Sequence, residues 1–594
     1  MPLKSACTIL FALFYCLNAC SQQFYIRGEV RDEAGNLLQN ATILHLRTGY
    51  VYHSGSEGTF GILNERKEDS LRITMPGFET QFILANAEKY VSAKLRKLSL
   101  AATSLRRDKL ASLTRGLGKE DQQSWFTGDE TYASIVENHF VEAKRFPVTG
   151  MSLNVDRASY SNIRRFINLH SQVPPDAVRI EEMINYFNLH YQEPPVGETF
   201  RARTTLTQCP WNAASQLLFV NLCSRKLDRD LLPPSNLVFL IDVSGSMDMP
   251  NRLPLLKSAF RLLVNNLRAK DSVAIVVYGG VTGVLMNTTS GAEKDSILRT
   301  IDQLEPGGST PGESGIKLAY SVANNHFITG GNNRVILATD GDFNVGLKTE
   351  SELDEMITLQ RKAGIYLTCL GVGMGNYKDS KIQLLSEKGN GNYAYLDNYQ
   401  EAEKVLMKEF TQTLYAVADN VYMNVSFNPD QVKQYRLIGF DNKVGALRDS
   451  LSAIEGGEIG SGYSLVALFE IALTENGTAA IRDHFTTGSL GTLNLQYQMP
   501  GSMQPLQLHY DCPFLFTEFQ ELDASYRFSA AVALYGSLLK NSGFTRNSVW
   551  DDIITLASQS TPKDDPVQQE FIRIVQETKN LYTKIKKKKG GSRD

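Results

Sequence analysis

The stretch LVFLIDVSGSM, residues 237–247, decides the fold of the central part of the chain. Its apolar run Leu237–Ile241 is short and continuous, which predicts a strand buried on both faces of a parallel sheet. The run ends in Asp242-x-Ser244-x-Ser246, a turn rich in oxygen-bearing side chains. Ligands of an open parallel sheet bind beyond the carboxyl ends of its strands. We therefore expect these three side chains to lie at a ligand-binding edge.

The sequence around this stretch alternates between strand and helix patterns. Leu253–Leu267 has apolar residues at helical spacing, which predicts an amphipathic helix. Further buried strands are predicted at Ser272–Tyr278, Arg334–Thr339 and Ile365–Val372. This alternation predicts a doubly wound, Rossmann-like α/β domain over residues 236–415.

Two more polar motifs follow, at the expected ends of strands of this sheet. Gly307-Gly308-Ser309-Thr310 precedes a helix, and Thr339-Asp340-Gly341-Asp342 follows a strand. Together with the first word they resemble the metal-ion-dependent adhesion site of von Willebrand factor type A domains. The matching residues are Asp242, Ser244, Ser246, Thr310 and Asp340. A lone DxSxS turn could equally cap a helix. Three such motifs at the expected carboxyl ends of the strands favour a metal site.

The donor set points to a particular class of ion. Carboxylate and hydroxyl oxygens are hard ligands that suit Mg²⁺, with Mn²⁺ or Ca²⁺ as alternatives. The resemblance implies that the serine and threonine hydroxyls bind directly and that the two aspartates act partly through water. One coordination position then stays open for an Asp or Glu of a protein partner. Asp248 and Asp342 lie close to the ligands in sequence and are interpreted as solvated loop carboxylates, with a water-mediated role as the alternative.

The regions on either side resemble other known modules. Residues 24–97 have short alternating strands and words such as Gly28-x-Val30-x-Asp32, which resemble a carboxypeptidase regulatory-like β-sandwich. Residues 98–130 are interpreted as a linker. Residues 131–235 and 416–584 resemble the α+β regions that flank the type A domain in a family of bacterial proteins. Residues 585–594 are interpreted as a basic tail. The chain departs from that pattern at Tyr463, where the resemblance predicts histidine.

The first residues predict export from the cytoplasm. Lys4 precedes an uncharged apolar run from Ala6 to Leu17, which is typical of a signal peptide. The tetrapeptide ending in Cys20 resembles a lipobox, so we expect a signal over residues 1–20, a lipidated Cys20 and a lipoprotein of a Gram-negative outer membrane. The alternative is cleavage after Ser21, which would give a secreted or periplasmic soluble protein.

Composition and cysteine usage exclude several other functions. A formal net charge of −3 lacks the basic surface that nucleic-acid binding needs. Cys209 and Cys223 flank a predicted hairpin, so a disulfide between them is an open alternative, whereas Cys369 is predicted to be buried and free. No GxSxG or GxxxxGK[ST] motif occurs, and Gly371–Tyr377 lacks the last glycine of a dinucleotide site.

The sequence therefore predicts a non-enzymatic adhesion or scaffold protein of the cell envelope. Its partners would be a protein offering Asp or Glu to the metal, and a membrane through the lipid anchor. The alternative is an accessory or regulatory subunit for assembly of an envelope or secreted enzyme complex.

Overall fold

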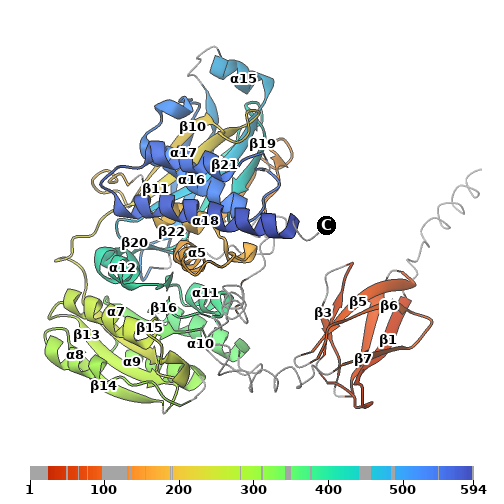
Figure 1. Cartoon of the computed structure of the whole chain (residues 1–594). Helices are drawn as coiled ribbons and strands as arrows, with labels where there is room; N and C mark the ends of the chain where they lie inside the picture. Colours follow the sequence, from red (N-terminus) through yellow and green to blue (C-terminus); the bar gives the residue numbers. More distant parts are fainter. Residues whose placement is uncertain are drawn as a thin grey trace, which may run out of the picture. The chain divides into compact units, whose positions relative to one another are not determined.

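The computed structural model describes most of the chain in two compact units, Met1–Gly118 and Lys119–Asp594 (Figure 1). The described residues are 24–96 and 130–590, except for 40, 48–50, 56, 65, 76–77, 131, 133–136, 154, 188, 190, 281, 309–311, 342–349, 375–376, 441–456, 483–487, 503 and 546. The predicted signal peptide, Cys20 and nearly all of the predicted linker lie outside them. No helix of the described residues is long and apolar enough to cross a bilayer.

The first unit is a β-sandwich, as the sequence predicts. Its strands are β1 (Phe24–Asp32), β2 (Thr42–His45), β3 (Val51–His53), β4 (Thr59–Asn64), β5 (Glu68–Thr74), β6 (Gln81–Asn86) and β7 (Val91–Leu95). They form two sheets in the orders β4-β1-β7 and β3-β2-β5-β6. Alternate residues of β1 and β7 point inward, so Ile26, Val30 and Ala93 share one apolar core with Ile43 and Leu71 of the other sheet.

The α/β domain of the second unit has six strands in the order β14-β13-β12-β15-β16-β17. They are β12 (Ser235–Asp242), β13 (Ser272–Tyr278), β14 (Gly283–Ser290), β15 (Asn332–Thr339), β16 (Ile365–Gly371) and β17 (Tyr393–Tyr395). All pairs are parallel except β13 with β14. Along β12, Leu237, Phe239 and Ile241 belong to one core, whereas Val238 and Leu240 belong to the core on the opposite face.

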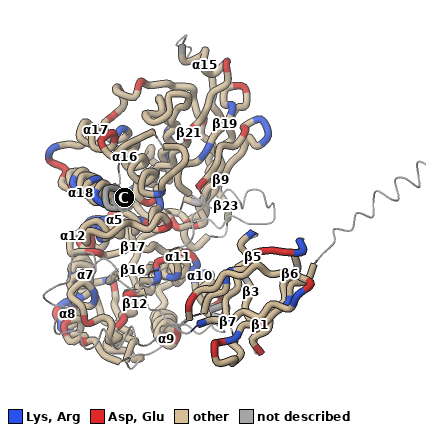
Figure 2. The backbone as a smooth tube through the Cα atoms, turned by 45° about the vertical axis from the view of Figure 1, so that its right-hand side comes forward, with Lys and Arg blue, Asp and Glu red and all other residues tan. Residues whose placement is uncertain are grey.

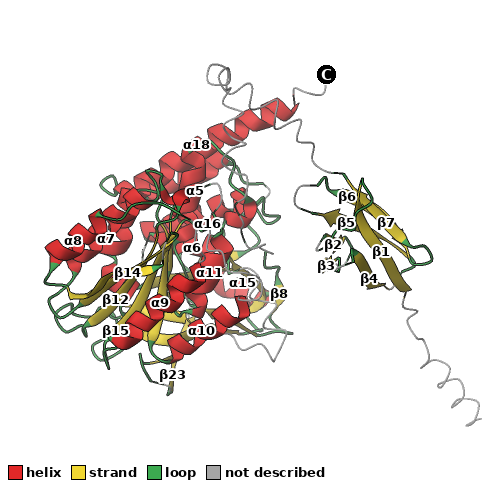
Figure 3. Cartoon of the chain, turned by 90° about the horizontal axis from the view of Figure 1, so that it is seen from below, coloured by secondary structure: helices red, strands yellow, loops and turns green. Residues whose placement is uncertain are grey.

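Helices cover both faces of this sheet, which confirms the doubly wound fold (Figure 3). One face is covered by α7 (Leu253–Asn266), α8 (Lys294–Asp302) and the segment formed by α12 (Tyr399–Glu403), a π-helical turn (Lys404–Lys408) and α13 (Phe410–Leu414). The other face is covered by α9 (Gly312–Asn325), α10 (Glu350–Lys362) and α11 (Asp379–Lys388). The sheet is therefore buried on both sides, which explains its continuous apolar strands.

The sequences before and after the α/β domain fold together into a single flanking body. Its strands are β8 (Val141–Glu142), β9 (Val148–Ser152), β10 (Phe200–Gln208), β11 (Gln216–Ser224), β18 (Ala416–Phe427), β19 (Val432–Ile438), β20 (Gly457–Gly460), β21 (Ser464–Leu473), β22 (Ser489–Gln498) and β23 (Pro505–Pro513). One sheet has the order β10-β11-β21-β19-β8, and the other has β20-β18-β22-β23 with β9 on β18. Each sheet thus contains strands from both sides of the α/β domain.

Helices form a third layer on this body. They are α5 (Ala158–Asn168), α6 (Ile180–Tyr186), α16 (Ala524–Leu539), α17 (Trp550–Ser560) and α18 (Pro566–Gly590), with α15 (Glu475–Arg482) at a separate position. Leu217 and Phe219 of β11 face these helices, whereas Leu218 and Val220 face the second sheet. The sequence separates a basic tail from residue 585, whereas the structure continues α18 to Gly590 because no helix breaker interrupts its lysine-rich end.

Buried ion pairs join the flanking body to the α/β domain. Arg164 of α5 pairs with Asp397 at 2.5 Å and with Glu401 at 2.7 Å, and Arg179 pairs with Asp379 at 2.6 Å. On another side, Arg334 of β15 pairs with Glu458 of β20 at 2.6 Å. Because each of these side chains is at most 7% exposed, separating the two parts would expose paired charges together with their hydrogen bonds.

Candidate metal centre

The predicted site lies where β12 and β15 end side by side. The two strands are parallel neighbours, with Ile241 opposite Ala338, so Asp242 and Asp340 follow at the same edge of the sheet. Both aspartates are buried. The charge of Asp340 is one of the influences that raise the pKa of Asp242, which shows that the two carboxylates lie close enough to repel.

Hydrogen bonds from several directions hold the Asp242 carboxylate. The Ser244 backbone N–H donates to Oδ1 at 2.9 Å. The hydroxyls of Tyr278 and Thr339 each donate to Oδ2 at 3.1 Å. Burial is the main cause that raises the pKa of Asp242, while the bonds from Ser244 lower it. The result is a fixed, poorly hydrated carboxylate at the sheet edge.

The turn after Asp242 places two hydroxyls beside each other. Ser244 Oγ and Ser246 Oγ are 3.0 Å apart, at the start of the short 3₁₀ turn Gly245–Met247. Gly279 packs against this turn with a φ of +114°, and a Cβ there would lie 2.2 Å from the Ser244 nitrogen. Only glycine allows the β13 end to approach so closely, so it helps to fix the position of Ser244.

The loop that carries the predicted threonine is bonded to the same turn. Gly307 N–H donates to the Val243 carbonyl at 2.7 Å, and Gly245 N–H donates to the Gly308 carbonyl at 3.1 Å. Thr310 itself lies outside the described residues, as does Asp342. The structure therefore brings together four of the predicted ligands, Asp242, Ser244, Ser246 and Asp340. It also bonds Gly307 and Gly308, which precede the fifth predicted ligand in sequence, to the same turn.

The donor set fits a small divalent cation. Its carboxylate and hydroxyl oxygens are the hard ligands that Mg²⁺ prefers, and the two serine hydroxyls are hydrogen-bonded to each other at 3.0 Å. Among the described residues, no group of three or more His, Cys, Asp or Glu is arranged so that it could hold a metal ion. A site of two carboxylates and three hydroxyls would not form such a group, so this finding does not bear on the assignment.

Arg252 is a residue at this edge that the sequence analysis missed. It immediately precedes α7, and its Nη1 lies 2.8 Å from Asp340 Oδ2. The same nitrogen donates to the Ser246 carbonyl, and Nη2 donates to the Met374 carbonyl at 2.8 Å. The only sequence signal is a basic residue shortly after the DxSxS turn. Its pairing depends on loops that meet only in the folded chain.

The remaining candidates are placed as follows. Asp248 is exposed, in agreement with its interpretation as a loop carboxylate. Cys209 and Cys223 are buried free thiols. Cys209 adjoins the Ser215 end of the β10–β11 ladder, whereas Cys223 pairs with Arg201 at the other end. Because the pleat rises about 3.4 Å per residue, they are roughly 27 Å apart, and no disulfide joins them.

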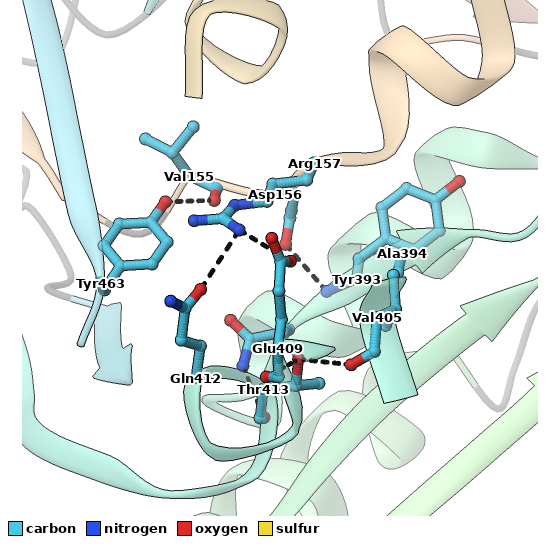
Figure 4. A pocket seen from close by; sticks show the side chains of 11 residues that line it. Val155, Asp156, Arg157, Tyr393, Ala394, Val405, Glu409, Gln412, Thr413 and Tyr463 are labelled. Carbon is cyan, nitrogen blue, oxygen red and sulfur yellow. Dashed lines mark hydrogen bonds and ion pairs between the residues drawn. The ribbon is translucent and has the colours of Figure 1, made fainter. Parts of the chain in front are cut away.

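A small cavity lies between the flanking body and the α/β domain (Figure 4). Its volume is about 40 Å³, which holds a few waters and is far below the size of a ligand pocket. Arg157 crosses it, pairing with Glu409 at 2.8 Å and lying 4.7 Å from the ring centre of Tyr463. The Tyr463 hydroxyl donates to the Val155 carbonyl at 2.9 Å. Where the family pattern predicts histidine, this chain thus has a tyrosine that packs the domain junction.

Comparison with known proteins gives matches over nearly all of the second unit. Residues 236–408 match the von Willebrand factor type A domain, and 126–219 match a region described as von Willebrand factor. Residues 412–581 match the C-terminal region of uncharacterized protein YfbK. YfbK of Escherichia coli (strain K12) is 36% identical over 76% of this chain and 81% of its own length. Human inter-alpha-trypsin inhibitor heavy chain H2 is 27% identical over 33% of this chain and 21% of its own length.

Comparison with solved structures also gives matches, two of which follow. The von Willebrand factor type A protein of Catenulispora acidiphila has 12% identity and a TM-score of 0.39, covering 65% of this chain and 90% of its own. BatB of Bacteroides thetaiotaomicron has 21% identity and a TM-score of 0.26, covering 30% and 97% respectively.

Proposed function

Since the chain belongs to the YfbK family and contains a von Willebrand factor type A domain, we propose that it captures a protein partner through a divalent cation. Asp242, Ser244, Ser246, Thr310 and Asp340 would hold the ion, with Mg²⁺ as the usual occupant and Mn²⁺ or Ca²⁺ as alternatives. The partner would supply an Asp or Glu carboxylate to the open coordination position. The role is binding, without catalysis.

The meeting of Asp242, Ser244, Ser246 and Asp340 at one edge of the parallel sheet is the observation that supports this proposal. The hydroxyls of Ser244 and Ser246 are hydrogen-bonded to each other at 3.0 Å, so both oxygens lie close enough together to bind one cation. The ion supplies a strong positive charge that attracts a carboxylate. The protein supplies the fixed oxygens, because Tyr278 and Thr339 orient Asp242 from the opposite side.

We also propose that the protein is exported and lipidated at Cys20, and that the cation site therefore operates at the cell envelope. The sequence of the first twenty residues supports this proposal. In Figure 2 basic and acidic positions are interspersed along the elements in view, and the net charge is −3. A protein with this net charge is not attracted electrostatically to anionic lipids, so in this proposal the lipid on Cys20 attaches it to the membrane. Cys20→Ser should move the protein from the membrane fraction to the soluble fraction.

A capture experiment tests the proposed function. The tagged protein would be incubated with envelope extract in Mg²⁺ and in EDTA, alongside Asp242→Ala and Thr310→Ala variants checked by circular dichroism. A true partner should be retained only by the wild type in Mg²⁺. Asp302→Ala changes an exposed aspartate on α8 and should retain the partner. Equal retention by all variants with and without EDTA would contradict a metal-dependent interaction.

A further inference from the structure

Arg252 places a fixed positive charge within the proposed cation site. Its guanidinium contacts Asp340 and the carbonyls of Ser246 and Met374. Two of these contacts are to proposed ligand residues, Ser246 and Asp340. The third ties the guanidinium to the loop after β16. One side chain therefore links three loops that surround the site.

The position of this guanidinium is determined by packing as well as by hydrogen bonds. Its side chain is 13% exposed. The loop residue Gly373 lies directly against it with a φ of +83°, and a Cβ at Gly373 would lie 2.5 Å from Arg252 Nε. Because the backbone of residue 252 leads directly into α7, the guanidinium is held in place before any ion or partner binds.

The charges that contact one another at this edge can be summed. Asp242 and Asp340 contribute two negative charges, and Arg252 contributes one positive charge, so their sum is about −1 before a metal is bound. A divalent cation brings this sum to about +1. Without Arg252 the two carboxylates of Asp242 and Asp340 and the ion would sum to zero. Asp248 of the same turn is exposed, so water and salt screen its contribution.

We infer that Arg252 determines the specificity of the site by weakening its hold on the cation and strengthening the attraction of the loaded site for an anionic partner group. This inference rests on the proposed function. It deepens that function by assigning the preference for a carboxylate to a residue of the chain as well as to the ion. Charge repulsion within about 6 Å at the edge of a protein changes affinity by tenfold or more, so both effects are measurable.

The test uses Mn²⁺ as the metal probe and a glutamate-coated surface as the partner probe. Wild type, Arg252→Met and Arg252→Lys are titrated with Mn²⁺ by calorimetry, and their retention on the surface is measured in saturating Mn²⁺. Arg261→Met is the matched control, because Arg261 lies on α7, the helix that follows Arg252, and makes an exposed ion pair with Asp302. Each variant is compared with wild type by urea unfolding.

Arg252→Met should bind Mn²⁺ about tenfold more tightly and be retained several-fold less on the surface. Arg261→Met should resemble wild type in both measurements, and Arg252→Lys, which keeps the charge but not the contacts of the guanidinium fork, should lie between wild type and Arg252→Met. Damage to the site would lower both affinities together, so parallel losses, or no change, would overturn the inference. If wild type binds Mn²⁺ and the surface but Arg252→Met behaves like Arg261→Met, only the inference fails. If wild type takes up no Mn²⁺, the inference and the proposed function fail together.

Discussion

Asp242 shows how single residues prepare the metal edge. Its carboxylate is buried, yet a Ser244 N–H, the Tyr278 hydroxyl and the Thr339 hydroxyl already satisfy it. These bonds reduce the cost of keeping a charged group out of water and fix the direction of its lone pairs. Under the proposed function, the carboxylate of Asp242 would thus be positioned before an ion binds, in part by the hydroxyls of Tyr278 and Thr339, which are not proposed ligands.

Tyr278→Phe should lower Mg²⁺ affinity without unfolding the protein. Loss of the hydroxyl removes one of the hydrogen bonds that orient Asp242. Removing a residue that hydrogen-bonds a metal ligand typically lowers metal affinity by about 10- to 100-fold. Tyr320→Phe is the matched control, because Tyr320 is equally buried in the same core and its hydroxyl has no hydrogen-bond partner among the described residues. Calorimetric titration measures both. Equal affinities for the two variants would show that Tyr278 does not orient the ligand.

The elements of the α/β domain were largely predictable from the sequence, because parallel strands buried on both faces are continuous apolar runs. β13 has the predicted bounds Ser272–Tyr278, and α7 begins at the predicted Leu253. The role of Arg252 could not be predicted in this way. A basic residue next to a helix start has no distinctive pattern, and its partners Asp340 and Met374 come from distant loops.

The shared sheets of the flanking body were also beyond sequence reasoning. β11 pairs with β21 across the whole inserted α/β domain, and β9 pairs with β18 in the same manner. An alternating pattern identifies a strand but not its partner when the pairing is so far apart in sequence. The flanking regions were therefore recognised by resemblance as separate regions, whereas their union into one body is a finding of the structure.

The loop between β16 and α11 gives a test at the scale of an element. Gly373→Ala should lower the free energy of unfolding by about 1–3 kcal/mol, because alanine would be strained at the φ of +83° and its Cβ would also displace Arg252. Gly330→Ala is the control, since Gly330 has a φ of +71° with open space around it. It should cost only about 1 kcal/mol. Urea unfolding compares them, and equal losses would contradict the tight contact with Arg252.

At the scale of the whole molecule, buried ion pairs hold the α/β domain against the flanking body. Glu458 of β20 and Arg334 of β15 are both almost completely buried. Burial raises the pKa of Glu458 to about 7, although the charge of Arg334 acts to lower it. This junction therefore responds to pH in the range just below neutrality.

The sign of that response follows from linkage. Between its ordinary pKa of about 4.5 and the folded value of about 7, Glu458 keeps a proton in the folded protein that the unfolded chain releases. The free energy of unfolding should therefore fall as pH rises through this window. Glu458→Gln lacks this contribution, so its stability relative to wild type should rise by on the order of 3 kcal/mol from pH 4.5 to 7.5.

Urea unfolding at several pH values measures this difference. The exposed Glu521→Gln provides the control and should show a constant difference from wild type. A Glu458→Gln difference that is equally flat would mean that burial does not shift the titration of Glu458 in the folded protein. The comparison uses only the change with pH, so the cost of altering the ion pair itself does not affect the conclusion.

The central claim is that the edge formed by Asp242, Ser244, Ser246, Thr310 and Asp340 binds a divalent cation. Calorimetric titration of the metal-stripped protein with Mg²⁺ or Mn²⁺ tests it most directly, with Asp242→Ala beside the wild type. The wild type should bind one ion per chain and melt at a higher temperature when loaded, because the ion binds the folded state alone. Asp242→Ala should keep its fold and lose most of this affinity. A folded wild type that takes up no metal, or an Asp242→Ala variant that binds as tightly, would contradict the account.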